Sequence, residues 1–277
     1  MAGNLEVNFE DKKQSSSKWF RELRNQMVGS IEKIDSSNFK EKQWDRDQGG
    51  GGLMSILKGD VFEKVGVNIS TVHGEFSEEF RKNIPGTEKD PTFWASGISV
   101  VAHMKNPKIA AAHFNTRYIV TSSKSWFGGG CDLTPAIPEE RETANFHSGL
   151  KRTLDQHNQE YYSKFKKECD AYFYLKHRKE PRGIGGIFFD YLNTNNFEKD
   201  LNFIKDVGQF FANFIIKNTN DKKNLSYDQE DLKKLSHKRS RYVEFNLLHD
   251  RGTLFGLKTG GNIEAILMSM PPEAKWE

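Results

Sequence analysis

The sequence predicts an α+β protein that folds as a single domain over residues 1–277. Three observations support this prediction: a helical apolar pattern near the amino end, a pair of strand-like segments in the middle, and long helical patterns after them. A chain of 277 residues and 31.9 kDa can bury a large core, and no repeat or linker divides it.

The first half of the chain favours one helix followed by strands. Apolar residues from Trp19 to Ile34 recur at helical spacing, and serines before them can cap a first turn, so a helix is expected over about 17–34. The run of glycines at 49–52 predicts a flexible loop. Residues 97–120 indicate an antiparallel hairpin around an Asn-Pro turn signal.

The second half alternates between turn signals and helical patterns. WFGGGCDLTPAIP, residues 126–138, combines glycines with prolines and predicts a rigid turn without regular structure. Apolar spacing predicts two helices over 139–175, broken near 156–160, and another over 197–214. Strands are expected in IFFDYLN and over 242–272, and a polar surface loop over 217–231.

Composition excludes several classes of protein. A formal net charge of +3 is too small for the electrostatic footprint of a nucleic-acid binder, and no apolar run approaches the length of a membrane span. The start, MAGNLEVNFEDKKQ, lacks the apolar middle of a secretory signal, so a cytoplasmic protein is expected. Cys131 and Cys169 match no disulfide, zinc or redox pattern and are expected to be free thiols.

Four histidines lie near other polar residues and are candidate ligands or catalysts. Singly, each is more often a structural or surface histidine. Together they could surround one metal ion, although their spacings match no compact motif such as HExxH. The set is His103, His113, His147 and His177.

The predicted hairpin aligns polar side chains. Because side chains alternate along a strand, Ser99 and His103 share one face of the first strand, while His113, Asn115 and Arg117 share one face of the second. The Arg117 fork could bind a carboxylate, with Asn115 adding a directional hydrogen bond. A surface ion pair is the alternative for Arg117.

Glycine-rich segments give one candidate carboxylate and exclude one class of cofactor. Asp132 follows three glycines, where a ligand can approach closely; a turn-forming aspartate is the alternative. The turns at 183–186 and 260–262 match no phosphate-binding fingerprint. Neither a nucleotide nor a flavin cofactor is therefore expected.

Four longer motifs carry a resemblance to a known family. They are HMKNPKIAAAHFNTRY, WFGGGCDLTP, YFYLKHRKEPRGIGGIFFDYLN and YVEFNLLHDRGTLFGLKTGGNIEAILMSMPP. Together, and in this order, they closely resemble the oxygen-dependent coproporphyrinogen III oxidase family over nearly the whole chain.

The resemblance implies a fold, an assembly and an activity. The implied fold is a large flat antiparallel sheet flanked by helices on both faces, with the substrate in a deep cleft beside it. The implied assembly is a homodimer, for which about 242–277 match the dimerisation region. The implied activity converts coproporphyrinogen III, a tetrapyrrole, to protoporphyrinogen IX with dioxygen as co-substrate.

The resemblance also implies roles for single residues. His113 is implied as a proton donor and, with the other three histidines, as a ligand of a divalent metal such as manganese. Asp132 is implied as a second catalytic residue, and a fixed carboxylate there could accept the pyrrole N–H groups of a puckered porphyrinogen. The implied substrate-binding residues are Ser99, Asn115, Thr116, Arg117, Gly260, Gly261 and Asn262.

Two departures from the family pattern and two other hypotheses stay open. Many members have arginine where this chain has Asn262, a loss for which Lys258 or another cation would compensate. Members also commonly continue past the position of Glu277, which bears on dimer stability. The other hypotheses are a histidine-ligated metalloenzyme and a non-catalytic module that binds tetrapyrroles or anions.

Overall fold

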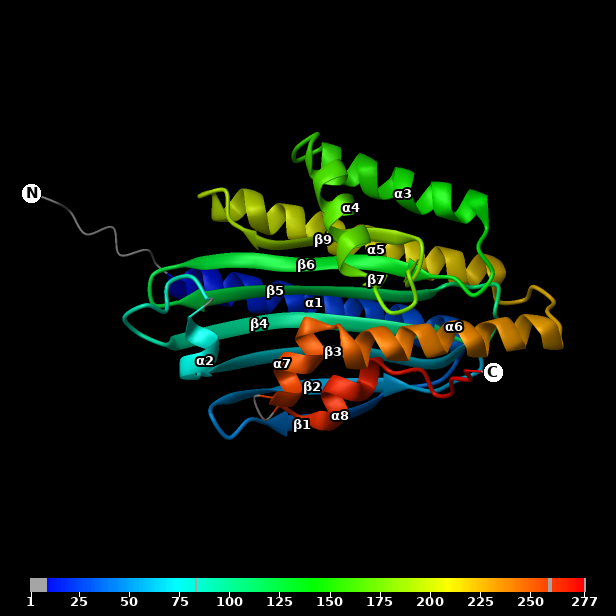
Figure 1. Ribbon diagram of the computed structural model, residues 1–277, viewed down its shortest axis with the longest axis horizontal. Helices are drawn as coiled ribbons and strands as arrows, with labels where there is room; N and C mark the ends of the chain where they lie inside the picture. The colour runs from blue at the N-terminus through cyan, green and yellow to red at the C-terminus, as the bar shows by residue number, and fades with distance from the viewer. Residues whose placement is uncertain (1–8, 83, 259–260, 277) are drawn as a thin grey trace, which may run out of the picture.

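A seven-stranded antiparallel sheet forms the centre of the protein (Figure 1). The computed structural model describes residues 9–82, 84–258 and 261–276. The first six strands follow chain order across the sheet, and the seventh joins the edge at β6 after two intervening helices. The strands, in sheet order, are β1 (Lys40–Asp45), β2 (Gly50–Leu57), β3 (Phe62–Glu75), β4 (Thr92–Met104), β5 (Ala111–Thr121), β6 (Ser125–Thr134) and β9 (Gly185–Leu192).

Helices lie on both faces of this sheet. In Figure 1, α1 and α5 lie behind the strands, whereas α6, α7 and α8 lie in front of them. A separate two-stranded ribbon pairs β7 (Tyr174–Leu175) with β8 (Glu180–Pro181). The α-helices are α1 (Phe9–Asp35), α2 (Glu78–Arg81), α3 (Glu140–Asp155), α4 (Tyr161–Tyr172), α5 (Phe197–Lys222), α6 (Gln229–Leu248), α7 (Arg251–Lys258) and α8 (Ile263–Ile266), and a short 3₁₀ helix, η1, spans Leu267–Ser269.

The apolar core lies between the sheet and the pair α1 and α5. Phe20, Leu23, Met27 and Ile31 form a buried stripe along α1, at the spacing that brings residues onto one face of a helix. Burial of each such side chain stabilises the fold by roughly 1.5–3 kcal/mol. These contacts hold one face of the sheet against helices and leave the other face for different chemistry.

The opposite face is covered by α6 and the segment that follows it. Val101 of β4, Tyr242 of α6 and Met268 of η1 form a small apolar cluster there. The start of α6 is fixed by a capping box in which the Asp228 side chain accepts a hydrogen bond from the Asp231 backbone N–H at 2.9 Å. The prediction of a large antiparallel sheet with helices on both faces is confirmed.

Several predicted elements are confirmed with shifted bounds. The first helix begins at Phe9, eight residues before the predicted start, because its first turns are polar and carry little apolar signal. The predicted hairpin is β4 and β5, and the break between α3 and α4 falls at 156–160. The flexible loop predicted at 49–52 is wrong for three of its four glycines, because β2 begins at Gly50; Gly49 and Gly50 have positive φ.

Three further predictions about local structure are wrong. The segment predicted as a rigid turn at 126–138 is mostly β6, a strand paired on both sides by β5 and β9. The segment predicted as a loop at 217–231 is mostly helix, since α5 ends at Lys222 and α6 begins at Gln229. The tail predicted as strands over 242–272 contains helices instead. The prediction failed because the buried side of α6 includes the polar residues Arg239 and Asn246, so it shows no regular apolar pattern.

None of the helices in the described residues combines the length and the apolar character of a membrane span.

Candidate active site

Polar side chains from neighbouring strands meet on the sheet face that α6 covers in part. The strand register places Ser99 of β4 opposite Asn115 of β5, and His113 of β5 opposite Asp132 of β6. Arg117 lies between two glycines, Gly97 on one side and Gly128 on the other. Because those glycines carry no side chains, the guanidinium lies over open backbone.

The centre of this face is a hydrogen-bonded aspartate–histidine pair. His113 Nδ1 donates to Asp132 Oδ1 at 2.8 Å. The Asp132 side chain is 1% exposed, whereas the His113 side chain is 15% exposed. The carboxylate therefore fixes the histidine tautomer from inside, and the histidine is the member of the pair that reaches the surface.

Arg182 completes the buried side of the pair. Its Nη2 donates to both carboxylate oxygens of Asp132, at 2.8 and 2.7 Å, and its side chain is 1% exposed. The rings of Phe173, Tyr242 and Phe245 surround the guanidinium, with centroids 3.9, 4.6 and 4.7 Å from its central carbon. The aromatic faces and the carboxylate together offset the cost of burying this charge.

Burial and charge act in opposite directions on this pair. Burial alone raises the pKa of the Asp132 carboxyl, but Arg182 and His113 favour the anion more strongly, so the pKa lies below its usual value. Burial lowers the pKa of Arg182 and the Asp132 charge raises it, with a net result above the usual value. Asp132 is thus an anion and Arg182 a cation at neutral pH.

The outer nitrogen of His113, Nε2, has a hydrogen-bond partner on the same strand. Asn115 Nδ2 donates to His113 Nε2 at 3.0 Å, which agrees with a lone pair on Nε2 and a proton on Nδ1. The Asn115 Oδ1 atom is buried without a hydrogen-bond partner among the described residues. A buried acceptor without a partner is costly, and a substrate donor at this point would satisfy it.

Arg117 has an ionic partner of its own. Its Nη2 lies 3.0 Å from Oδ1 of Asp190 on β9, and the two side chains are 34% and 20% exposed. Arg117 therefore forms an ion pair, and this contact engages one nitrogen of the guanidinium and leaves its other donors for a ligand. Ser99 is half-buried beside Asn115.

Thr116 lies on the other face of β5 from Asn115 and Arg117. As the residue between Asn115 and Arg117, it points to the opposite face of β5, where its side chain is buried in the core layer. Its side chain cannot take the substrate-binding place that the family motif implies.

The four histidines implied as metal ligands have separate environments. His103 Nε2 donates to the backbone oxygen of Ser269 at 2.9 Å. His147 Nε2 donates to the backbone oxygen of Ile184 at 2.9 Å, and its Nδ1 accepts from Tyr162 at 3.1 Å. Burial lowers the pKa of His103 to about 3, which holds this histidine neutral.

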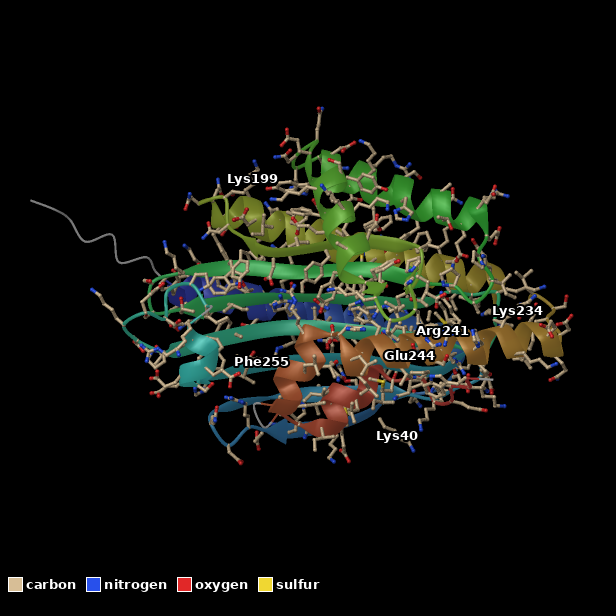
Figure 2. The ribbon with its side chains drawn as sticks, viewed as in Figure 1. Lys40, Lys199, Lys234, Arg241, Glu244 and Phe255 are labelled. Atoms are coloured by element: carbon tan, nitrogen blue, oxygen red, sulfur yellow. The ribbon has the colours of Figure 1, made fainter. Side chains whose placement is uncertain are left out.

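His177 is also engaged by other side chains. Its Nε2 donates to Glu244 at 2.7 Å, and its Nδ1 accepts from His249 at 3.0 Å. Glu244 lies beside Arg241 on α6 (Figure 2) and also accepts from Arg178 and from the Trp276 indole. In the part of the chain that the structure describes, no group of three or more His, Cys, Asp or Glu side chains could hold a metal ion. The histidine set does not fit one shared metal centre.

The carboxyl-terminal turn gives a mixed result. Gly260 and the Lys258 side chain lie outside the described residues. The Gly261 backbone N–H donates to the Gly256 oxygen at 2.9 Å. Asn262 Oδ1 accepts from the Ala265 backbone N–H at 2.9 Å and so caps α8. The asparagine at this position thus has a structural task in the folded chain.

Two site residues were missed by sequence reasoning. Arg182 stands in the quoted motif PRGIGG, and Asp190 stands in IFFDYLN, but neither segment shows which partner the charge will meet. Only the alternation of β9, with Gly186, Phe188 and Asp190 on one face, could have indicated that Asp190 faces the site.

Comparisons with known proteins identify the family of this chain. The family model described as coproporphyrinogen III oxidase matches residues 15–277. An oxygen-dependent coproporphyrinogen-III oxidase of Rickettsia bellii is 57% identical over 271 residues, which cover 94% of this chain and 97% of that protein. Proteins of the same name from Rickettsia akari and Rickettsia rickettsii are each 55% identical, over 96% and 98% of this chain and 99% and 100% of theirs. The chain belongs to the coproporphyrinogen III oxidase family.

Proposed function

We propose that this protein catalyses the oxygen-dependent oxidative decarboxylation of coproporphyrinogen III to protoporphyrinogen IX, a step of haem biosynthesis. The observation that carries the proposal is 57% identity to an oxygen-dependent coproporphyrinogen-III oxidase across nearly the full length of both chains. Each of two propionates reacts with one dioxygen and one proton. The products of each reaction are a vinyl group, carbon dioxide and hydrogen peroxide.

The polar sheet face supports the binding of the substrate's carboxylates. Arg117 can donate several N–H groups to one propionate, and Asn115 and Ser99 flank it at fixed strand positions. Residues on strands are held more rigidly than residues on loops, which favours orientation of a large ring for reaction.

His113 is the proposed proton-transfer residue. Its Nε2 lies on the partly exposed side of the pair, and Asp132 holds its Nδ1. Because Asp132 is 1% exposed and already bound by Arg182, direct contact with pyrrole N–H groups is not the role that its position supports. Asp132 acts instead as a positioning residue that stabilises the protonated imidazole.

Dioxygen chemistry is supplied by the substrate in this proposal. A porphyrinogen has electron-rich pyrroles that react with dioxygen once a pyrrole nitrogen is deprotonated. The protein then contributes orientation and proton transfer. No step requires the four histidines to share a metal ion, and each of them is bound by other protein groups.

A homodimer is the assembly that we propose. Large apolar side chains are exposed on the carboxyl-terminal helices, where Figure 2 shows Phe255 on α7. Exposed apolar side chains on neighbouring segments of a chain are typical of a subunit interface. The exposed residues are Leu247, Leu248, Phe255, Leu257 and Ile263. Sedimentation at micromolar concentration would show a dimer, and a monomer at every concentration would contradict this assembly.

A cytoplasmic location stays a prediction. The two cysteines, Cys131 and Cys169, are free and buried, which agrees with a reducing compartment. Fractionation of the source cells checks this point.

The direct test compares aerobic and anaerobic reactions with coproporphyrinogen III. We expect vinyl products and oxygen uptake in air and no product without oxygen. Parallel reactions with chelator and with added manganese test whether a metal contributes. Failure of the wild-type protein to form vinyl products under any of these conditions would refute the proposed activity.

A further inference from the structure

A β-bulge at the edge of the site places an extra residue beside Arg117. Phe127 of β6 pairs with Leu192 of β9, whereas Gly129 pairs with Phe189. Two residues of β9, Asp190 and Tyr191, therefore face the single residue Gly128. Bulges of this kind redirect side chains and are frequent next to active sites.

The backbone of the bulge is unusual in a way that fixes Asp190. Tyr191 has a φ of 54°, in the left-handed region that a bulky residue rarely adopts. Its backbone N–H donates to Asp190 Oδ1 at 3.2 Å. Its ring packs on Trp126 of β6, with centroids 5.2 Å apart. The unfavourable backbone conformation of Tyr191 thus orients its N–H toward the Asp190 carboxylate and holds that carboxylate in place.

That carboxylate meets Arg117 directly above a glycine. The Asp190 Oδ1 and Arg117 Nη2 atoms are 3.0 Å apart. A Cβ atom on Gly128 would lie 2.6 Å from Asp190 Oδ1 and 2.9 Å from Arg117 Nη2. The space above Gly128 is therefore filled by the ion pair, and any side chain there would displace it.

We propose that Asp190 is a positioning residue, which holds the Arg117 guanidinium over Gly128 so that its remaining N–H groups receive a propionate of the substrate. This inference rests on the proposed function. A long arginine side chain without such a partner samples many rotamers and loses their entropy on binding. Asp190 uses only one side of the planar fork, which leaves the other donors oriented for the incoming carboxylate.

The test measures KM and kcat for coproporphyrinogen III in four proteins: wild type, Asp190→Ala, Arg117→Ala and the double variant. We expect Asp190→Ala to raise KM about two- to fivefold, the upper part of the range for a partly exposed ion pair, and to change kcat by less than about twofold. Because Asp190 acts through Arg117, adding Asp190→Ala to Arg117→Ala should raise KM by less than about twofold.

Controls separate positioning from general damage. Asp221→Asn breaks an exposed helical ion pair with Lys217 and should leave KM unchanged. Asp190→Asn keeps an acceptor for the Tyr191 N–H, so it tests the charge alone if the alanine variant is unstable. An unchanged KM in Asp190→Asn, or an equal KM penalty with and without Arg117, would overturn the role of Asp190. Inactive wild-type protein would instead overturn the proposed function itself.

Discussion

Replacement of Asp132 by alanine should cost stability as well as activity. If Asp132 were only a catalytic residue, as the family resemblance implies, its replacement would remove activity and leave the fold intact. The structure shows Asp132 and Arg182 each 1% exposed and joined at 2.7 and 2.8 Å. Asp132→Ala would leave the Arg182 cation buried without its anion.

The size of this effect follows from the burial of the pair. Removal of one partner from a buried ion pair costs about 3–5 kcal/mol, because the remaining charge is uncompensated. The three aromatic rings around Arg182 remain and limit the loss, so we expect a value of about 4 kcal/mol. For a domain of this size the melting temperature should fall by about 8–16 °C.

Thermal and urea unfolding of four proteins would measure this cost. They are the wild type, Asp132→Ala, Arg182→Met and the double variant Asp132→Leu with Arg182→Met. The double variant replaces both charges with apolar groups and should recover more than half of the lost stability, although it stays inactive. A melting temperature of Asp132→Ala within about 2 °C of wild type would refute the reasoning, as would a double variant no more stable than the single one.

Three further predictions concern single side chains. The pKa of Glu244 is lowered from 4.5 to about 2, and the hydrogen bond from Arg178 is the largest cause. The stabilisation from ionised Glu244 is therefore fully present above about pH 4.5 and is lost as the pH falls toward 2. Glu244→Gln should reduce the loss of stability between pH 4.5 and 2, as measured by Trp fluorescence, because the Trp276 indole donates to Glu244. The same acid-induced loss of stability in the variant and the wild type would contradict this. Asp35 accepts three backbone N–H groups from residues 60–62, so Asp35→Ala should lower the free energy of unfolding in urea by about 3 kcal/mol, and a loss under about 1 kcal/mol would contradict this. Arg117→Ala should raise KM about ten- to a hundredfold with little change in kcat, and an unchanged KM would exclude its carboxylate contact.

The parts of the site that follow from local alternation could be predicted from the sequence. Ser99, His113, Asn115 and Arg117 lie on one sheet face because side chains alternate along β4 and β5, and a hairpin fixes their register. Thr116 follows the same rule and lies on the other face. Alternation of side chains therefore placed Thr116 correctly, whereas the family motif grouped it with Asn115 and Arg117 as a substrate-binding residue.

The parts that depend on distant partners could not be predicted. The glycines before Asp132 indicate a turn by composition, but pairing by β5 and β9 makes them a strand. Arg182 is 50 residues from Asp132, and its aromatic surroundings come from α6 and the end of α4. Asn262 caps α8, a task that only the folded backbone reveals.

The late position of β9 in the chain has a consequence for synthesis. When the ribosome has released the strands up to Thr134, β6 is an open edge rich in glycine, and its inward carboxylate, Asp132, lacks its counter-charge. An unpaired edge invites pairing with another nascent chain. Arrival of Arg182 neutralises Asp132, and β9 then pairs with β6 a few residues later, so that β9 becomes the edge strand in place of β6. The residues that complete the site thus also end the exposure of the β6 edge in the growing chain.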